Sequence, residues 1–241
     1  MKLFTYLAMS AVVAFTACGS KSSEEKVTRD VEKAYNLAHS AGDKETVIQT
    51  LTQWVAVDSS ISQWAWDTLA YYHYFYKVTP GAVRNPETAL FYVNKGLAVS
   101  SNNEFLKDIK AKLVLEKGDD STAYTMFEEM WNSTQNPTYF WDLTWLEVAR
   151  GNVPKALQMI DQAMNDSTIM SGMVTMEHIQ AQITENVKSE AAFLFLKYQI
   201  EFSKQNIMKG AEYLQKCVEI DPNFYAAKRS IMELQRYSAG R

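Results

Sequence analysis

The sequence predicts an all-α protein built from repeated helical pairs, and three observations lead to that prediction. First, the composition is that of a globular protein, since 47% of the 241 residues are hydrophobic and 22% are charged. Second, residues 137–168 carry apolar side chains at helical spacing on both sides of a turn at Arg150-Gly151-Asn152. Third, similar pairs recur along the chain at a nearly constant register.

Residues 1–17 are expected to be a signal peptide rather than part of the fold. Lys2 supplies the positive charge, and residues 3–15 form an apolar stretch that is short for a membrane-spanning helix. The next residues, Phe15-Thr16-Ala17-Cys18, resemble a bacterial lipobox, in which the cysteine is acylated and becomes the mature N-terminus. The resemblance implies a lipid anchor on Cys18, with acyl chains such as palmitate. An ordinary signal peptide that is cut elsewhere is the alternative.

Residues 18–26 are rich in Ser and Glu and are expected to form a lipidated tether between the membrane and a helical domain at 27–241. Gly19 follows Cys18 where other lipoproteins have Asp, which resembles the pattern of bacterial lipoproteins sorted to the outer membrane. With Cys18 lipidated, Cys217 has no partner for an intramolecular disulfide. Its expected role is packing in the core.

Small residues mark the second helix of the pair at 137–168. Ala156 and Ala163 lie on one helical face, where they allow two backbones to approach closely. Together with Gly151 at the turn, this spacing resembles the tetratricopeptide repeat (TPR), a helix–turn–helix unit of about 34 residues. Four other units fit the same register and begin near residues 28, 63, 104 and 191. The resemblance implies a TPR-like α-solenoid of about five repeats, in which each pair buries its apolar face against its neighbours.

Three segments depart from the repeat. Residues 77–86 lengthen the turn of the second unit, and Pro86 is expected in the first turn of the returning helix. Residues 224–236 have helical spacing and are expected to form a capping helix at the C-terminal end. Residues 169–190 are an insertion whose apolar spacing predicts a short amphipathic helix. The residues that carry this last prediction are Met173, Met176, Ile179 and Ile183.

The sequence gives no indication of catalytic or metal chemistry. It lacks the glycine-rich nucleotide loops, the hydrolase nucleophile motif and the zinc-protease motif. His39, His73 and His178 are expected in separate helices, without ligand partners at metal spacing. A net charge of −4 and a pI near 5.5 provide no basic region for nucleic acid. We therefore expect no enzyme, no cofactor, no metal and no nucleic-acid partner.

Aromatic residues exceed what the repeat core requires, and the resemblance assigns some of them to a binding groove. In the TPR family the first helix of each unit lines a concave face. Position by position, this implies a groove formed by Trp64, Asp67, Tyr71 and Tyr74 from the second unit, Asp108 and Lys112 from the third, Trp141 and Trp145 from the fourth, and Phe195 and Gln199 from the fifth. Large aromatics in a groove are typical binding hot spots. The alternative is that residues 77–86 or the helix predicted within 169–190 fill the groove.

Two hypotheses for function follow from the groove. The first is a lipid-anchored scaffold that holds a protein or peptide partner of an envelope complex. Because Lys112 is the one basic residue among the groove positions, a clamp for a peptide's C-terminal carboxylate is disfavoured. The second hypothesis is a lipoprotein that captures a glycan or another small ligand by stacking on the same aromatics. An enzyme is a third hypothesis, which no motif supports.

Overall fold

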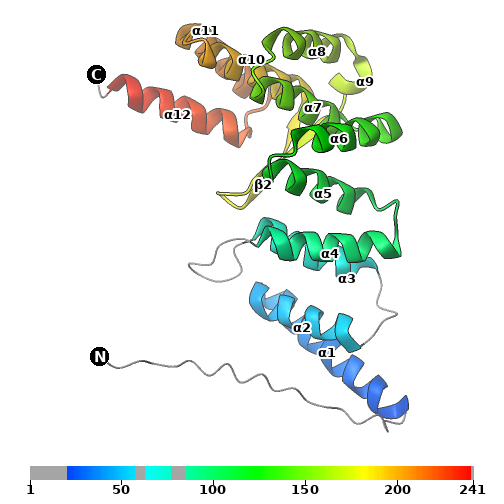
Figure 1. Cartoon of the computed structure of the whole chain (residues 1–241). Coiled ribbons are helices and arrows are strands. Elements are labelled where there is room, and N and C mark those ends of the chain that lie inside the picture. Colours follow the sequence, from blue (N-terminus) through cyan, green and yellow to red (C-terminus); the bar gives the residue numbers. More distant parts are fainter. Residues whose placement is uncertain (1–20, 58–62, 77–84, 240–241) are drawn as a thin grey trace, which may run out of the picture. The chain divides into compact units, whose positions relative to one another are not determined.

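The computed structural model describes residues 21–57, 63–76 and 85–239, which form twelve α-helices and one two-stranded hairpin (Figure 1). The chain divides into two compact units, Met1–Ile61 and Ser62–Arg241. The helices are α1 (Lys21–Ala41), α2 (Lys44–Val57), α3 (Gln63–Phe75), α4 (Pro86–Val99), α5 (Glu104–Glu116), α6 (Asp120–Thr134), α7 (Pro137–Ala149), α8 (Val153–Asn165), α9 (Ser167–Met170), α10 (Ser189–Ser203), α11 (Ile207–Ile220) and α12 (Tyr225–Ala239). The strands are β1 (Met173–His178) and β2 (Ile183–Lys188).

The described residues of the first unit, 21–57, form a single helical pair, α1 and α2, as predicted for the first repeat. Gly42 ends α1 in a left-handed conformation with φ of +69°, which glycine adopts without a steric penalty. Asp43 then accepts a hydrogen bond from the backbone N–H of Thr46 at 3.1 Å and so caps the start of α2. Val47 and Leu51 are buried on the inner face of α2. The local chemistry of the turn therefore explains where both helices stop and start.

The second unit contains the other four predicted pairs, α3/α4, α5/α6, α7/α8 and α10/α11, followed by α12 against α11. Gly118 and Gly151 end α5 and α7 with φ of +82° and +74°. Asn85 caps α4 through the backbone N–H of Thr88, and Pro86 lies in the first turn of that helix as predicted. Residues 77–84 of the predicted insertion lie outside the described residues. The predicted all-α solenoid with a C-terminal capping helix is confirmed.

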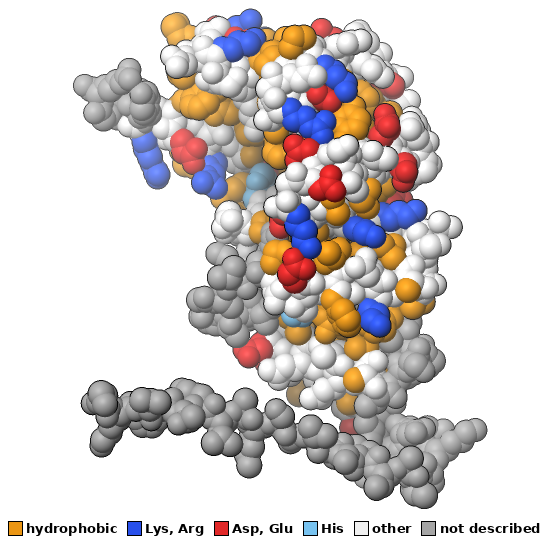
Figure 2. Space-filling view, in the orientation of Figure 1, with side chains coloured by type: hydrophobic (Ala, Val, Ile, Leu, Met, Phe, Trp, Pro, Cys, Tyr) orange, Lys and Arg blue, Asp and Glu red, His pale blue; other side chains and the backbone are white. Residues whose placement is uncertain are grey.

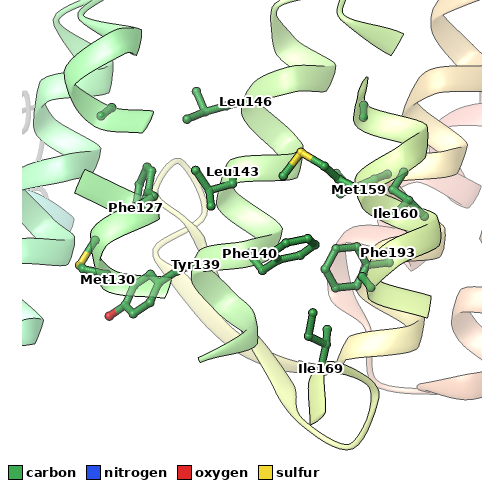
Figure 3. Packing of buried hydrophobic residues seen from close by; sticks show 14 of the residues in the cluster. Phe127, Met130, Tyr139, Phe140, Leu143, Leu146, Met159, Ile160, Ile169 and Phe193 are labelled. Carbon is green, nitrogen blue, oxygen red and sulfur yellow. The ribbon is translucent and has the colours of Figure 1, made fainter. Parts of the chain in front are cut away.

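The core of the second unit is formed where successive helical pairs meet. Ala156 and Ala163 are completely buried, which confirms the close approach predicted for them. Figure 3 shows Phe140 of α7 facing Phe193 of α10, and the two ring centroids are 6.2 Å apart. Helix α10 is buried along most of its length because one side packs on α7 and α8 and the other on α11. None of the described helices has the length and apolarity needed to cross a bilayer.

The prediction of an amphipathic helix within residues 169–190 is wrong. After the short α9, this insertion forms the antiparallel hairpin β1–β2, in which Val174 pairs with Val187. Buried side chains alternate with more exposed ones along β1, since Val174 and Met176 are buried and Thr175 is half-buried between them. This period of two, with β-branched residues in both strands, is the signal that the helical interpretation missed. His178, which was expected in a helix, therefore lies at the end of β1.

Candidate functional site

A cavity of about 710 Å³ lies in the second unit, lined by residues of α3, α5, α6, α7, α10, β1 and α12. Its volume is in the range of ordinary ligand pockets. Aromatic and charged side chains share its walls. Among the residues that line it are Lys112, Trp141, Asp142, Trp145, Glu177, Phe195, Gln199, Tyr225 and Arg229.

Helix α7 supplies a stripe of side chains to this cavity. Asn136 caps the helix through the backbone N–H of Thr138, and Pro137 occupies the first turn, so the helix starts at a fixed residue. Positions 142, 145, 146 and 149 recur at the three- and four-residue steps of one helical face, and all of them line the cavity. Trp141, one position earlier, also lines it and donates its indole N–H to the carbonyl oxygen of Ala192 at 3.1 Å. This hydrogen bond fixes the orientation of the Trp141 ring.

Lys112 is at the centre of a polar cluster at one end of the cavity. Its ammonium group donates to Asp108 Oδ2 at 2.7 Å and to Glu177 Oε2 at 2.9 Å. Tyr74 donates its hydroxyl to the same Glu177 oxygen at 3.0 Å. Burial disfavours the charged ammonium, but the carboxylates of Asp108 and Glu177 outweigh it and hold the pKa of Lys112 well above its usual value. The cluster therefore joins α3 and α5 to β1 through a charged lysine.

Asp142 lies near Lys112 but takes no part in the hydrogen bonds of this cluster. Its Oδ2 atom is buried and has no hydrogen-bond partner among the described residues. Burial raises the pKa of Asp142 well above its usual value, and the attraction of Lys112 only partly opposes this, because the carboxyls of Asp108 and Glu177 are also nearby. The Oδ2 atom of Asp142 is thus a buried oxygen that no donor of the described residues satisfies.

The raised pKa of Asp142 predicts how stability depends on pH. A carboxyl whose pKa is higher in the folded chain stabilises the fold at low pH, and this contribution is lost as the pH rises from about 4 toward the folded-state pKa. We expect Asp142→Asn to match the wild type near pH 4. Above that, its free energy of unfolding should exceed that of the wild type by an amount that grows by up to about 1.4 kcal/mol per pH unit. Urea titrations monitored by circular dichroism at several pH values measure this, and parallel pH profiles would contradict it.

The structure divides the residues predicted for the groove into two groups. The first group comprises the residues from α3. Trp64 is 37% exposed and is not part of the cavity wall, while Asp67 accepts hydrogen bonds from Gln63 and Asn103, both at 2.9 Å. Tyr71 lies 3.4 Å from Thr184 of β2 through its hydroxyl, and Tyr74 is buried under Glu177 of β1. The hairpin therefore contacts the tyrosines of α3, which is the kind of filling that the alternative interpretation anticipated.

The second group comes together at the cavity, whose lining also includes Tyr74: Lys112, Trp141, Trp145, Phe195 and Gln199. Asp108 lies beside it as the ion-pair partner of Lys112. Sequence reasoning missed Asp142, although it lies on the same helical face as Trp145. It also missed Glu177, because its segment was predicted as a helix and not as a strand. Tyr225 and Arg229 were missed because their helix, α12, was interpreted only as a cap.

Glu185 of β2 fixes the start of α12, which forms one wall of the cavity. Its carboxylate accepts hydrogen bonds from the backbone N–H groups of Tyr225 at 2.7 Å and Ala226 at 3.3 Å. It also lies 2.5 Å from His178 Nε2, and the ring of His178 stands 5.4 Å from that of Tyr225. A carboxylate at the first turn of a helix is favourable because it satisfies free N–H groups and complements the helix dipole.

Removing this contact should loosen α12. We expect Glu185→Ala to lower the free energy of unfolding by about 1–2 kcal/mol and to speed amide exchange in the first two turns of α12. Hydrogen-exchange mass spectrometry of the intact protein measures the second effect. Glu219→Ala is a matched control on α11, because that carboxylate bonds only to the exposed side chain of Gln215 among the hydrogen bonds of the structure. Equal exchange in the two variants would contradict a capping role for Glu185.

His39, His73 and Cys217 each make packing contacts within the fold. His39 stacks on Tyr35 and His73 stacks on Tyr92, with ring centroids 5.6 and 5.3 Å apart. The Cys217 thiol is buried and donates to the carbonyl oxygen of Ala191 at 3.3 Å, and burial raises its pKa to about 12. Its expected place in the core is confirmed. Within the described ranges, no three His, Cys, Asp or Glu side chains are grouped so as to hold a metal ion.

Charges are mixed on the surface of the molecule. Figure 2 shows Lys and Arg side chains interspersed with Asp and Glu side chains over the face that it presents. This face has no extended basic region of the kind that follows a nucleic-acid backbone.

Comparisons with known proteins identify the fold. A crystallised tetratricopeptide repeat protein from Parabacteroides merdae aligns with a TM-score of 0.54 at 14% identity, covering 84% of this chain and 68% of that one. The MamA protein aligns with a TM-score of 0.52 at 10% identity, covering 82% and 93%. YrrB, described as a TPR protein with an unusual peptide-binding site, aligns with a TM-score of 0.50 at 14% identity, covering 87% and 99%. No family model matches the sequence, and no curated protein matches it significantly. The chain thus has the TPR fold.

Proposed function

We propose that this protein is a non-enzymatic, lipid-anchored scaffold of the bacterial cell envelope that binds a segment of a protein partner in the cavity beside α7. The observation that carries the proposal is the wall formed by Trp141 and Trp145, which are half-buried and face an open cavity. Tryptophan side chains in pockets contribute much of the binding energy at protein interfaces.

The fold supports a binding role rather than catalysis. The aligned structures share the helical-repeat architecture, and YrrB is a solved relative in fold that has a peptide-binding site. Sequence identities of 10–14% support a shared fold but not a shared binding site. The evidence for the site therefore comes from the residues of this chain. Hydrogen bonds join β1 to α7 through Thr138 and β2 to α12 through Glu185. The cavity is therefore formed before a partner arrives, which lowers the entropic cost of binding.

The membrane anchor rests on the lipobox-like sequence that ends at Cys18, which lies outside the described residues. The proposed place is the outer membrane, because Gly19 follows the cysteine. Labelling of cells with a palmitate analogue, followed by membrane fractionation, tests the anchor. Wild type should be labelled and pelleted with membranes, whereas Cys18→Ser should be unlabelled and released. A Cys18→Ser variant that keeps its label would contradict the anchor and leave the cavity proposal standing.

Photo-crosslinking in cells tests partner binding. A benzophenone amino acid at Ser230 of α12 faces the cavity, and the same amino acid at the exposed Glu128 of α6 is the control, because Glu128 is not part of the cavity wall. We expect a discrete protein adduct from position 230 that is absent from position 128. The adduct should disappear in a Trp141→Ala/Trp145→Ala background that still folds by circular dichroism. Equal adducts from both positions would argue against the cavity as the binding site.

A glycan or small ligand is the second candidate, favoured by the unsatisfied acceptors of Asp142 and Gln199 beside the Trp145 ring. Sugar hydroxyls would satisfy such acceptors while the ring stacks on the indole. Binding to a glycan array that is lost in the double tryptophan variant, with no protein adduct from position 230, would replace the first candidate by the second.

A further inference from the structure

The cavity wall has buried hydrogen-bond acceptors and more acidic than basic side chains. Together with His178, five Asp or Glu side chains and two Lys or Arg side chains line it: Glu116, Asp120, Asp142, Glu177, Glu233, Lys112 and Arg229. Both basic groups are already engaged within the protein. Lys112 bonds to Asp108 and Glu177, and Arg229 Nε lies 2.9 Å from Glu233 Oε1. Neither of them donates a hydrogen bond to Asp142 in the structure.

Two atoms of the cavity wall are buried without hydrogen-bond partners among the described residues, and both are acceptors. They are Asp142 Oδ2 and Gln199 Oε1. Leaving a buried polar atom unpaired costs about 1–3 kcal/mol, and more for a charged group. A ligand with several N–H donors would satisfy both atoms. An anion would instead meet further negative charge.

The aromatic walls suit the same chemistry. Trp141, Trp145, Phe195 and Tyr225 line the cavity together with Asp142. The faces of aromatic rings attract organic cations, and tryptophan does so most strongly. Carboxylate acceptors within aromatic walls are thus complementary to a guanidinium or ammonium group in both charge and shape.

We propose that the cavity selects a basic side chain, arginine or lysine, of the bound partner segment, and that Asp142 releases its proton to solvent on binding and pairs with this cation between the aromatic walls. This inference rests on the proposed function, because it specifies which residue of a protein partner enters the site. Asp142 and Gln199 are the acceptors, and Trp145 supplies the ring surface. The specificity is opposite to that of a groove that clamps a peptide carboxylate.

The test uses a defined probe and fluorine NMR on the full chain labelled with fluorotryptophan. The six tryptophans give separate reporters, and Trp141→Phe and Trp145→Phe assign the two that belong to the cavity. The probe is the tripeptide N-acetyl-Gly-Arg-Gly-amide, titrated to millimolar concentration. Its control is the same peptide with citrulline, which has nearly the shape of arginine but a neutral urea group, with a carbonyl oxygen in place of one guanidinium nitrogen.

We expect the arginine peptide to shift the Trp145 resonance and to bind about tenfold more tightly than the citrulline peptide, as expected for a hydrogen bond to a charged group. The Trp64 resonance should not move. In Asp142→Asn, which keeps the shape of the side chain, the ratio of the two affinities should fall to about one. Glu128→Gln, an exposed acid outside the cavity, should leave the ratio unchanged and controls for net charge.

Equal binding of the two peptides at Trp145 would overturn the preference for a cation and leave the proposed binding site intact. No shift of Trp145 with the arginine peptide would also overturn it, whereas the crosslink from position 230 tests the proposed function separately. An arginine preference that persists in Asp142→Asn would remove Asp142 from the recognition. Binding of free arginine as tightly as the peptide would assign the site to a small organic cation and contradict a partner segment.

Discussion

Replacing Lys112 with methionine is expected to lower the free energy of unfolding of the second unit by about 3–5 kcal/mol. The substitution removes the cation that lies among Asp108, Glu177 and Asp142. At neutral pH the buried carboxyls must then either stay charged without a counter-ion or take up protons, and both outcomes destabilise the fold. Urea unfolding of the full chain, followed by circular dichroism, measures the loss. The loss should shrink as the pH falls toward 4, because protonated carboxyls no longer need the cation.

The matched control is Lys117→Met. Lys117 forms an ion pair with Glu87 at 2.9 Å, the same separation as between Lys112 and Glu177, but the two side chains are 41% and 75% exposed. Exposed ion pairs contribute about 0–1 kcal/mol because water and salt screen them. If both methionine variants lose the same stability, the Lys112 cluster does not hold the hairpin against α3 and α5.

Replacing Phe193 with alanine is expected to cost about 3–5 kcal/mol, the usual range for a fully buried phenylalanine. Phe193 is completely buried and faces Phe140 (Figure 3), so the cavity that remains would lie at the contact between α10 and α7. The same urea experiment measures this loss. Phe202→Ala on the same helix is the control, since Phe202 is 45% exposed and should cost less than about 1.5 kcal/mol. Equal losses would place the packing centre of α10 elsewhere.

The repeat architecture was predictable because its signals are local and recur. Gly118 and Gly151 occupy left-handed turn positions, and Ala156 and Ala163 lie where two helices touch. Each of these residue types has a conformational or steric reason to be where it is, so spacing alone identifies the pairs. The burial of Cys217 followed from the same register.

The site was only partly predictable, because two non-repeat segments complete it. The hairpin carries Glu177 to Lys112 over a separation of 65 residues, and its strands were mistaken for a helix since Met173, Met176, Ile179 and Ile183 also fit a helical period. The other segment is α12, whose start depends on Glu185, a contact across 40 residues. Such contacts between distant residues leave no periodic signal in one sequence. Trp141 and Trp145 were found because their helix belongs to a repeat.

The proposed function places the protein partner in the cavity at Trp145 rather than along the exposed part of the groove predicted from the repeat. Calorimetry with the partner segment identified by crosslinking tests it most directly, on wild type, Trp145→Ala and Trp64→Ala. Trp64 is 37% exposed and lies outside the cavity wall, so it is the matched control. We predict that Trp145→Ala weakens binding about 30-fold or more, as expected for a hot spot of at least 2 kcal/mol, and that Trp64→Ala changes it by less than about threefold. Unchanged affinity in Trp145→Ala, or a larger loss in Trp64→Ala, would contradict the account.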